Sequence, residues 1–100
     1  MDVLYRGTMR MIMYQMEQCP FCKHFIRMFK NEVQGGEIVS LDGHNDPRWQ
    51  KFELNYVPTV IAYDEEGNEA SRLESVAMVG IRKDRWHRWL SDLNIEEGKN

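Results

Sequence analysis

Hydrophobic and polar positions follow one another along this chain in blocks that predict short strands separated by amphipathic helices. Residues 11–16 are almost continuously apolar and predict a buried strand. The next segment is predicted to be a helix that stops at Gly35-Gly36, because its apolar side chains recur at helical spacing. These apolar positions are Phe21, Phe25, Met28 and Phe29. A second strand over residues 38–41 must run parallel to the first, since a helix connects the two.

The second half of the chain continues with a helix, a pair of strands and a final helix. Asp46-Pro47 is typical of a helix start, with Asp as the N-cap, and the predicted helix runs toward Leu54. Residues 58–63 predict a third strand, and the turn-forming cluster after them predicts a hairpin to a fourth, antiparallel strand over residues 69–73. The last amphipathic helix is predicted over residues 83–93.

Composition limits the size and class of the protein. One hundred residues, of which 42% are hydrophobic and 29% charged, suit one globular domain, predicted over residues 11–94. Residues 1–10 are interpreted as an N-terminal extension and residues 95–100 as a polar C-terminal tail that frays. The net charge of −3 argues against nucleic acid as a partner. No apolar run has the length of a signal peptide or a membrane span, so we expect a cytoplasmic protein without a membrane partner.

The two cysteines of the chain lie in the motif Cys19-Pro20-Phe21-Cys22, at the predicted junction of a strand and a helix. Unpaired N–H groups at a helix start stabilise an anion, so Cys19 is predicted to be the thiolate that attacks a disulfide. Lys23 adds a positive charge nearby and is predicted to assist that thiolate. Cys22 lies one turn later and is predicted to attack the mixed disulfide on Cys19, which releases the reduced product.

Other interpretations of the cysteine pair stay open. The pair can be half of a zinc site, although no second CxxC and no histidine pair at zinc-site spacing accompanies it. The protein would then be a non-catalytic module that binds zinc or a partner chain. A disulfide kept for stability alone is disfavoured, because closing so small a loop constrains the unfolded chain little. The available histidines, which we otherwise expect at the surface, are His24, His44 and His87.

The order of elements, the CxxC helix and the proline before the third strand together make residues 11–93 resemble the thioredoxin superfamily. Cys19-Pro20-Phe21-Cys22 is similar to the CPYC motif of glutaredoxins, with Phe in place of Tyr. The resemblance implies a four-stranded mixed sheet with helices on both faces. It also implies a cis proline in Val57-Pro58-Thr59, where the Val57 backbone faces Cys19 and pairs with a substrate chain. Phe21 and Gly80 are further substrate contacts that it implies.

The function that this resemblance implies is reduction of protein or small-molecule disulfides by a thiol–disulfide oxidoreductase. No metal and no tightly bound cofactor is expected, and either glutathione or a thioredoxin-reductase-type protein would supply electrons. Gly80 stands alone where a glutaredoxin usually has a double glycine and a nearby aspartate, which favours the protein reductase. Met13 replaces the buried strand acid of thioredoxins. The expected partners are disulfide-containing proteins and a disulfide reductase, and the protein itself is expected to be a monomer.

Overall fold

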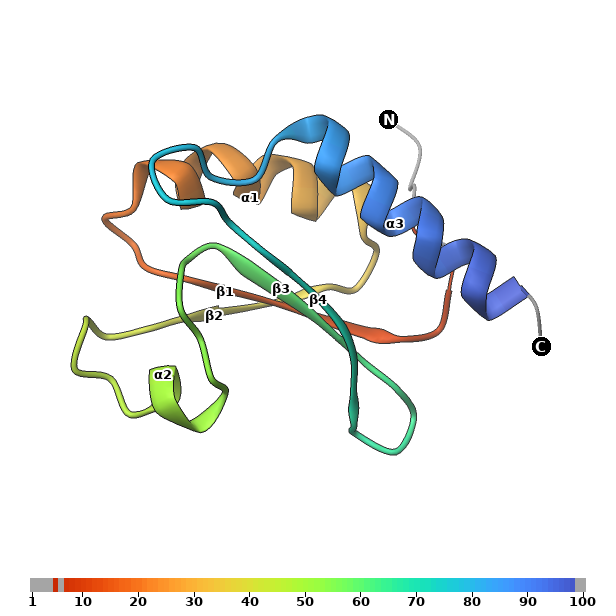
Figure 1. Ribbon diagram of the computed structural model, residues 1–100, viewed down its shortest axis with the longest axis horizontal. Helices are drawn as coiled ribbons and strands as arrows, with labels where there is room; N and C mark the ends of the chain where they lie inside the picture. The colour runs from red at the N-terminus through yellow and green to blue at the C-terminus, as the bar shows by residue number, and fades with distance from the viewer. Residues whose placement is uncertain (1–4, 6, 99–100) are drawn as a thin grey trace.

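A computed structural model describes residues 5 and 7–98 of the chain (Figure 1). Its helices and strands follow the order that the sequence predicts. In chain order they are β1 (Arg10–Gln15), α1 (Pro20–Glu32), β2 (Glu37–Ser40), α2 (Arg48–Lys51), β3 (Thr59–Tyr63), β4 (Glu69–Glu74) and α3 (Lys83–Gly98). The protein is therefore an α/β domain.

The four strands form one mixed sheet in the order β2-β1-β3-β4. β1 and β2 are parallel, with Met13 opposite Ile38, as the intervening helix requires. β3 is antiparallel to β1 and to β4. Helices α1 and α3 cover one face of the sheet and α2 lies on the other (Figure 1). The predicted mixed sheet with helices on both faces is thus confirmed.

The continuous apolar run of β1 is explained by burial on both faces of the sheet. Successive strand side chains point to opposite faces. Met11 and Met13 therefore join the core beneath α1 and α3, whereas Ile12 and Tyr14 join the core on the α2 side. Each of these side chains is at most 6% exposed. A strand buried on both faces needs apolar residues at every position.

Aromatic side chains hold α1 against α3. The ring of Phe25 meets that of Trp86 edge to face, with centroids 4.8 Å apart, and both side chains are fully buried. Trp89 stacks on Trp86 and donates through Nε1 to Ser71 Oγ on β4. Edge-to-face pairs of this kind contribute about 0.5–1.5 kcal/mol beyond their burial. The position of α1 over the sheet is therefore firmly determined.

Two helix boundaries differ from the expected ones. The helix expected to run toward Leu54 has one turn, because Glu53 adopts a positive φ of 53° and ends it. The N-cap residue is Pro47 rather than the predicted Asp46, whose carboxylate accepts the Arg48 N–H at 2.9 Å from one position earlier. The last helix continues to Gly98 rather than ending at Leu93, because no proline or glycine interrupts it earlier. No helix in the described part of the chain is long and apolar enough to cross a membrane.

The segment interpreted as an N-terminal extension contributes to the core. Tyr5 is 6% exposed and packs in the core beneath α1 and α3. Its N–H donates to the Glu32 carbonyl, and its hydroxyl accepts the Met9 N–H. Residues 1–4 and 6 of that predicted extension, and residues 99–100 of the predicted tail, lie outside the described residues.

Candidate active site

The predicted site residues come together at one end of the sheet. Three segments meet there: the start of α1, the loop that enters β3, and the loop that enters α3 (Figure 1). Cys19 Sγ lies 3.8 Å from the carbonyl oxygen of Val57. The backbone of Gly80 lies directly against Phe21 on the other side. Residues that are far apart in the chain therefore surround the two cysteines.

Cys19 is the N-cap residue of α1. Its backbone is extended, with φ −93° and ψ 115°, and Pro20 follows at the first helical position. The Sγ atom accepts a hydrogen bond from the Cys22 N–H at 3.2 Å. A cysteine here takes the place of the Ser or Asp that usually caps a helix, so the unpaired donors of the first turn stabilise negative charge on its sulfur. Cys19 is also partly exposed, which leaves that sulfur open to attack a partner.

Cys22 differs from Cys19 in its surroundings. Its side chain is 0% exposed and belongs to the core beneath α1 and α3. Burial, and after it the hydrogen bond with Cys19, raises the pKa of the Cys22 thiol to about 12. Both thiols are free. The pair therefore combines an accessible sulfur with a buried one that keeps its proton.

The loop before β3 has the geometry that the resemblance implies. The Val57–Pro58 peptide bond is cis, as expected. The Val57 carbonyl faces Cys19, and the Val57 side chain is half-buried. Pro58 and Thr59 are fully buried, and the Thr59 hydroxyl donates to the Tyr56 carbonyl at 2.7 Å. The Thr59 side chain thus holds the loop in shape and does not present itself to a substrate.

Phe21 and Gly80 form one contact. Gly80 has φ +82°, a conformation that glycine adopts without strain. A Cβ atom at this position would lie 2.9 Å from Phe21 Cδ1, so the close approach depends on glycine. Phe21 is 37% exposed, and the loop that carries Gly80 holds three more exposed apolar residues. They are Val76, Met78 and Val79.

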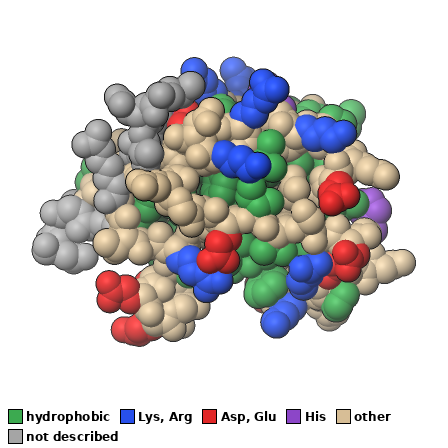
Figure 2. All heavy atoms as spheres, turned by 180° about the vertical axis from the view of Figure 1, so that it is seen from behind, with side chains coloured by type: hydrophobic (Ala, Val, Ile, Leu, Met, Phe, Trp, Pro, Cys, Tyr) green, Lys and Arg blue, Asp and Glu red, His purple; other side chains and the backbone are tan. Residues whose placement is uncertain are grey.

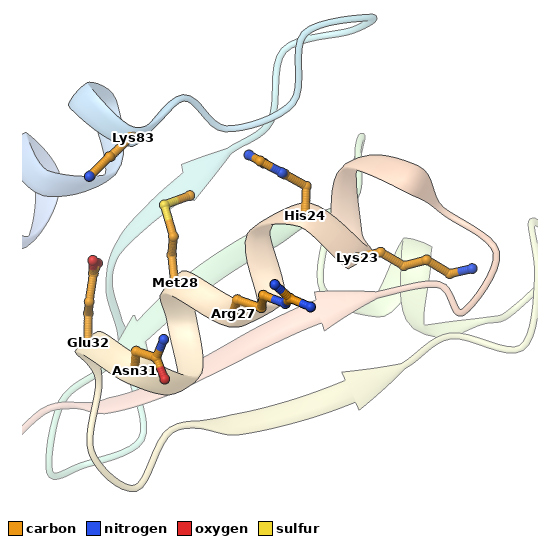
Figure 3. Close-up of a pocket in the computed structure, with 7 residues that line it drawn as sticks. All are labelled: Lys23, His24, Arg27, Met28, Asn31, Glu32 and Lys83. Carbon is orange, nitrogen blue, oxygen red and sulfur yellow. The ribbon is translucent and has the colours of Figure 1, made fainter. Parts of the chain in front are cut away.

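Lys23 is exposed on α1, one residue after Cys22. Within the described residues no hydrogen bond or ion pair joins its ammonium group to Cys19. Its side chain extends along the outer side of the helix (Figure 3). Any assistance to the Cys19 thiolate is therefore a longer-range electrostatic one.

Sequence reasoning missed a buried polar cluster at the other end of α1. Glu32 is 4% exposed and accepts a 2.7 Å hydrogen bond from Trp86 Nε1. His87 Nε2 lies 3.0 Å from each Glu32 carboxylate oxygen, so the prediction of His87 as a simple surface residue is wrong. The sequence could have indicated that Glu32 is buried, because Glu32 follows Phe25 by seven residues on the apolar face of α1.

Other histidines contribute nothing to the cysteine pair. His24 is exposed on α1, and His44 stacks on Trp49 beside α2. In the described part of the chain no group of three or more His, Cys, Asp or Glu side chains could hold a metal ion.

Comparison with known proteins adds no further evidence. A scan against protein-family models matches none of them, and a search of curated proteins finds no significant match. The functional argument rests on the geometry of the site.

Proposed function

We propose that this protein is a dithiol–disulfide oxidoreductase with a thioredoxin fold. The observation that carries the proposal is the asymmetry of the two cysteines. Cys19 caps a helix and is a partly exposed residue, whereas Cys22 is fully buried and its N–H donates to Cys19 Sγ. The order of elements and the cis proline opposite Cys19 support the fold assignment. Reducing compartments such as the cytoplasm suit a free, reactive thiol pair of this kind.

The first step is attack by the Cys19 thiolate on a disulfide of the substrate. A bond forms between Cys19 Sγ and one substrate sulfur, and the substrate S–S bond breaks. The second substrate sulfur leaves as a thiolate and takes a proton from water. Helix-start donors stabilise Cys19 as the attacking anion, and the Cys22 N–H is one of these donors. The product of this step is a mixed disulfide.

The second step is attack by Cys22 on the mixed disulfide. Burial is the main cause of the raised pKa of Cys22, and the hydrogen bond with Cys19 and negative charge on Cys19 add smaller shifts in the same direction. That charge disappears when Cys19 enters the mixed disulfide, so Cys22 loses its proton more readily at the moment when it is needed. The Cys22 thiolate attacks Cys19 Sγ, the protein disulfide forms, and the reduced substrate leaves with both electrons. Water accepts the Cys22 proton.

The substrate chain is proposed to pass between the two loops that flank Cys19. The Val57 carbonyl is directed at Cys19 and can accept an N–H of an extended substrate segment. Phe21 with the exposed apolar residues of the loop before α3 forms the opposite border. A patch of this kind suits a protein partner better than a small polar one.

A protein reductase of the thioredoxin-reductase type is the proposed electron donor. The Gly80 N–H donates to the Val76 carbonyl at 2.8 Å and is therefore not free to bind a glutathione carboxylate. The neighbouring side chains are apolar, including Met78 at 88% exposure. The test measures reduction of the oxidised protein by glutathione with its reductase and, in parallel, by NADPH with thioredoxin reductase. Faster turnover with glutathione would contradict this choice of donor.

Single replacements of the two cysteines test the proposed function. The variant Cys19→Ser is expected to lose reduction of a disulfide-linked peptide completely. The variant Cys22→Ser is expected to retain the first step and to accumulate a mixed disulfide on Cys19, visible as the peptide mass added to the intact protein. A titration of free thiols after incubation with oxidised glutathione supplies an independent check. Unchanged thiols in the wild type, or activity in Cys19→Ser, would refute the proposal.

A further inference from the structure

A groove between α1 and the start of α3 is not used by the proposed reaction. It has a volume of about 610 Å³. Lys23, His24 and Arg27 come from α1, and Lys83 comes from the start of α3 (Figure 3). The groove begins beside the cysteines, because Lys23 directly follows Cys22.

The positive charge in this groove is not compensated. Among the residues that the structure describes, Lys23, Arg27 and Lys83 take part in no ion pair, whereas other cations such as Arg10 and Arg72 do. The one carboxylate of the groove, Glu32, already accepts hydrogen bonds from Trp86 and lies against His87. The whole chain carries a net charge of −3, so the local excess of positive charge in the groove is opposite in sign to the net charge of the protein.

The surface view agrees with this distribution. Figure 2 shows several Lys and Arg side chains along the upper part of the molecule, the edge that α1 and α3 form in Figure 1, and others lower down beside acidic side chains. Most of the acidic side chains on that face lie lower down. Opposite charge on a partner would therefore be attracted to the edge that carries the groove and the cysteines.

We propose that this groove binds an acidic segment of the protein whose disulfide Cys19 attacks. The proposal rests on the proposed function and adds a substrate class to it: protein chains with Asp or Glu close to the reactive cysteine. Lys23, Arg27 and Lys83 would pair with these carboxylates. Met28 and Asn31 line the same groove and offer an apolar surface and an amide to the segment's side chains and backbone.

Helix geometry gives the spacing of the acidic residues. An α-helix rises about 1.5 Å per residue, so Cys19, Lys23 and Arg27 follow one another at intervals of about 6 Å along α1. An extended peptide covers that interval with about two residues. Acidic side chains about two and four positions from the substrate cysteine therefore match Lys23 and Arg27. A compact anion such as phosphate fits less well, because these cations are spread along the helix.

The test compares two disulfide-linked peptides that differ only in charge. One carries Glu at the second and fourth positions after its cysteine, and the other carries Gln there. The protein is expected to reduce the acidic peptide with a kcat/KM about three- to tenfold higher at low salt, a preference that shrinks at high salt. Equal rates at low salt, or a preference that salt does not change, would overturn the proposal.

Matched charge reversals locate the effect. The variant Arg27→Glu is expected to lose the preference for the acidic peptide and to keep its rate with the Gln peptide. The control Lys30→Glu makes the same charge change on α1 at an exposed position outside the groove, and it is expected to keep the preference. If both charge reversals reduced the preference for the acidic peptide equally, the preference would come from the overall charge of the protein and not from the groove, and the proposed site would be refuted. If Arg27→Glu does not fold, Arg27→Gln and Lys83→Gln replace it.

Binding is also measured apart from the redox reaction. A cysteine-free acidic peptide, with Ser in place of Cys, is titrated against the wild type and Arg27→Glu while the α1 resonances are followed by NMR. If the acidic peptide bound the wild type but the protein reduced no disulfide, the proposed binding groove would be supported and the proposed function would be refuted. Reduction of both disulfide-linked peptides at equal rates without binding would refute the groove alone. Tighter binding of inorganic phosphate than of the acidic peptide would make this a compact-anion site and would also overturn the proposal.

Discussion

Replacement of Gly80 by Ala tests how the loop before α3 is fitted to the active site. Gly80 has φ +82°, which costs an L-residue about 1–2 kcal/mol. The added methyl would also lie 2.9 Å from Phe21 Cδ1 and 3.1 Å from Phe21 Cβ. The ring can turn toward solvent, but the Cβ atom is held by the helix backbone, so overlap adds about 1–3 kcal/mol. The free energy of unfolding should fall by about 2–5 kcal/mol in total.

Gly67 provides a matched control for the backbone part of this cost. It has φ +85° in the turn between β3 and β4, and a Cβ there would have no atom within 4 Å. Gly67→Ala should therefore lose only about 1–2 kcal/mol. The difference between the two variants, measured by urea unfolding, isolates the contact with Phe21. Only Gly80→Ala is expected to slow reduction of a disulfide-linked peptide, because it alone displaces a residue that borders Cys19.

A double-mutant cycle with Phe21→Ala completes the argument. Phe21→Ala removes the ring contacts but keeps the Cβ atom, so the cost of Gly80→Ala should fall without reaching that of Gly67→Ala. Equal losses of stability in the two single Ala variants, or peptide turnover by Gly80→Ala that matches the wild type, would refute the fit between Phe21 and Gly80. A cost of Gly80→Ala that does not change in the absence of Phe21 would refute it as well.

Three further outcomes follow from the described contacts. Iodoacetamide should label the partly exposed Cys19 in the native protein and reach Cys22 only after unfolding, because Cys22 is buried and its pKa is raised to about 12. Mass mapping of the labelled protein that finds Cys22 modified first would contradict the assignment of roles. Glu32→Ala should lower the free energy of unfolding by about 1–3 kcal/mol, because Trp86 Nε1 is left buried without its acceptor. An unchanged midpoint of urea unfolding would contradict this loss of stability. Hydrogen bonds from Arg48 hold the pKa of the Asp46 carboxyl below its ordinary value of 3.8. The ionised Asp46 carboxylate therefore stabilises the fold above pH 3.8, and this contribution is lost as the pH falls below that value. The wild type should therefore lose more stability than Asp46→Asn on acidification, and parallel losses in the two proteins would show that the shift is absent.

Sequence patterns were sufficient where the physical cause is local. The apolar run of residues 11–16 predicted β1, because a strand buried on both faces needs apolar side chains at each position. Cys19 was predicted to lie at the start of α1 from the strand-to-helix junction and from Pro20, whose missing N–H suits the first turn. The hairpin between β3 and β4 followed from the turn residues alone.

Helix ends were less well predicted, because they depend on competing local preferences. The helix after Asp46 ends after one turn at Glu53, whose positive φ no composition rule indicates. The last helix passes Leu93 because no proline or glycine interrupts it before Gly98. The periodicity of apolar residues detects only the part of a helix that is buried, so it could not predict how far α3 continues after Leu93.

Side-chain contacts between distant segments were decided only by the tertiary structure. Glu32 meets Trp86 across 54 positions of the chain, and Phe21 meets Gly80 across a similar separation. The position of Glu32 on the apolar face of α1 could suggest a buried partner, but it could not name that partner. The groove between α1 and α3 exists for the same reason, since Lys83 comes near α1 only after α3 has packed on the aromatic face of α1. Local chemistry therefore determined the elements and the reactive pair, whereas packing of α3 decided what surrounds them.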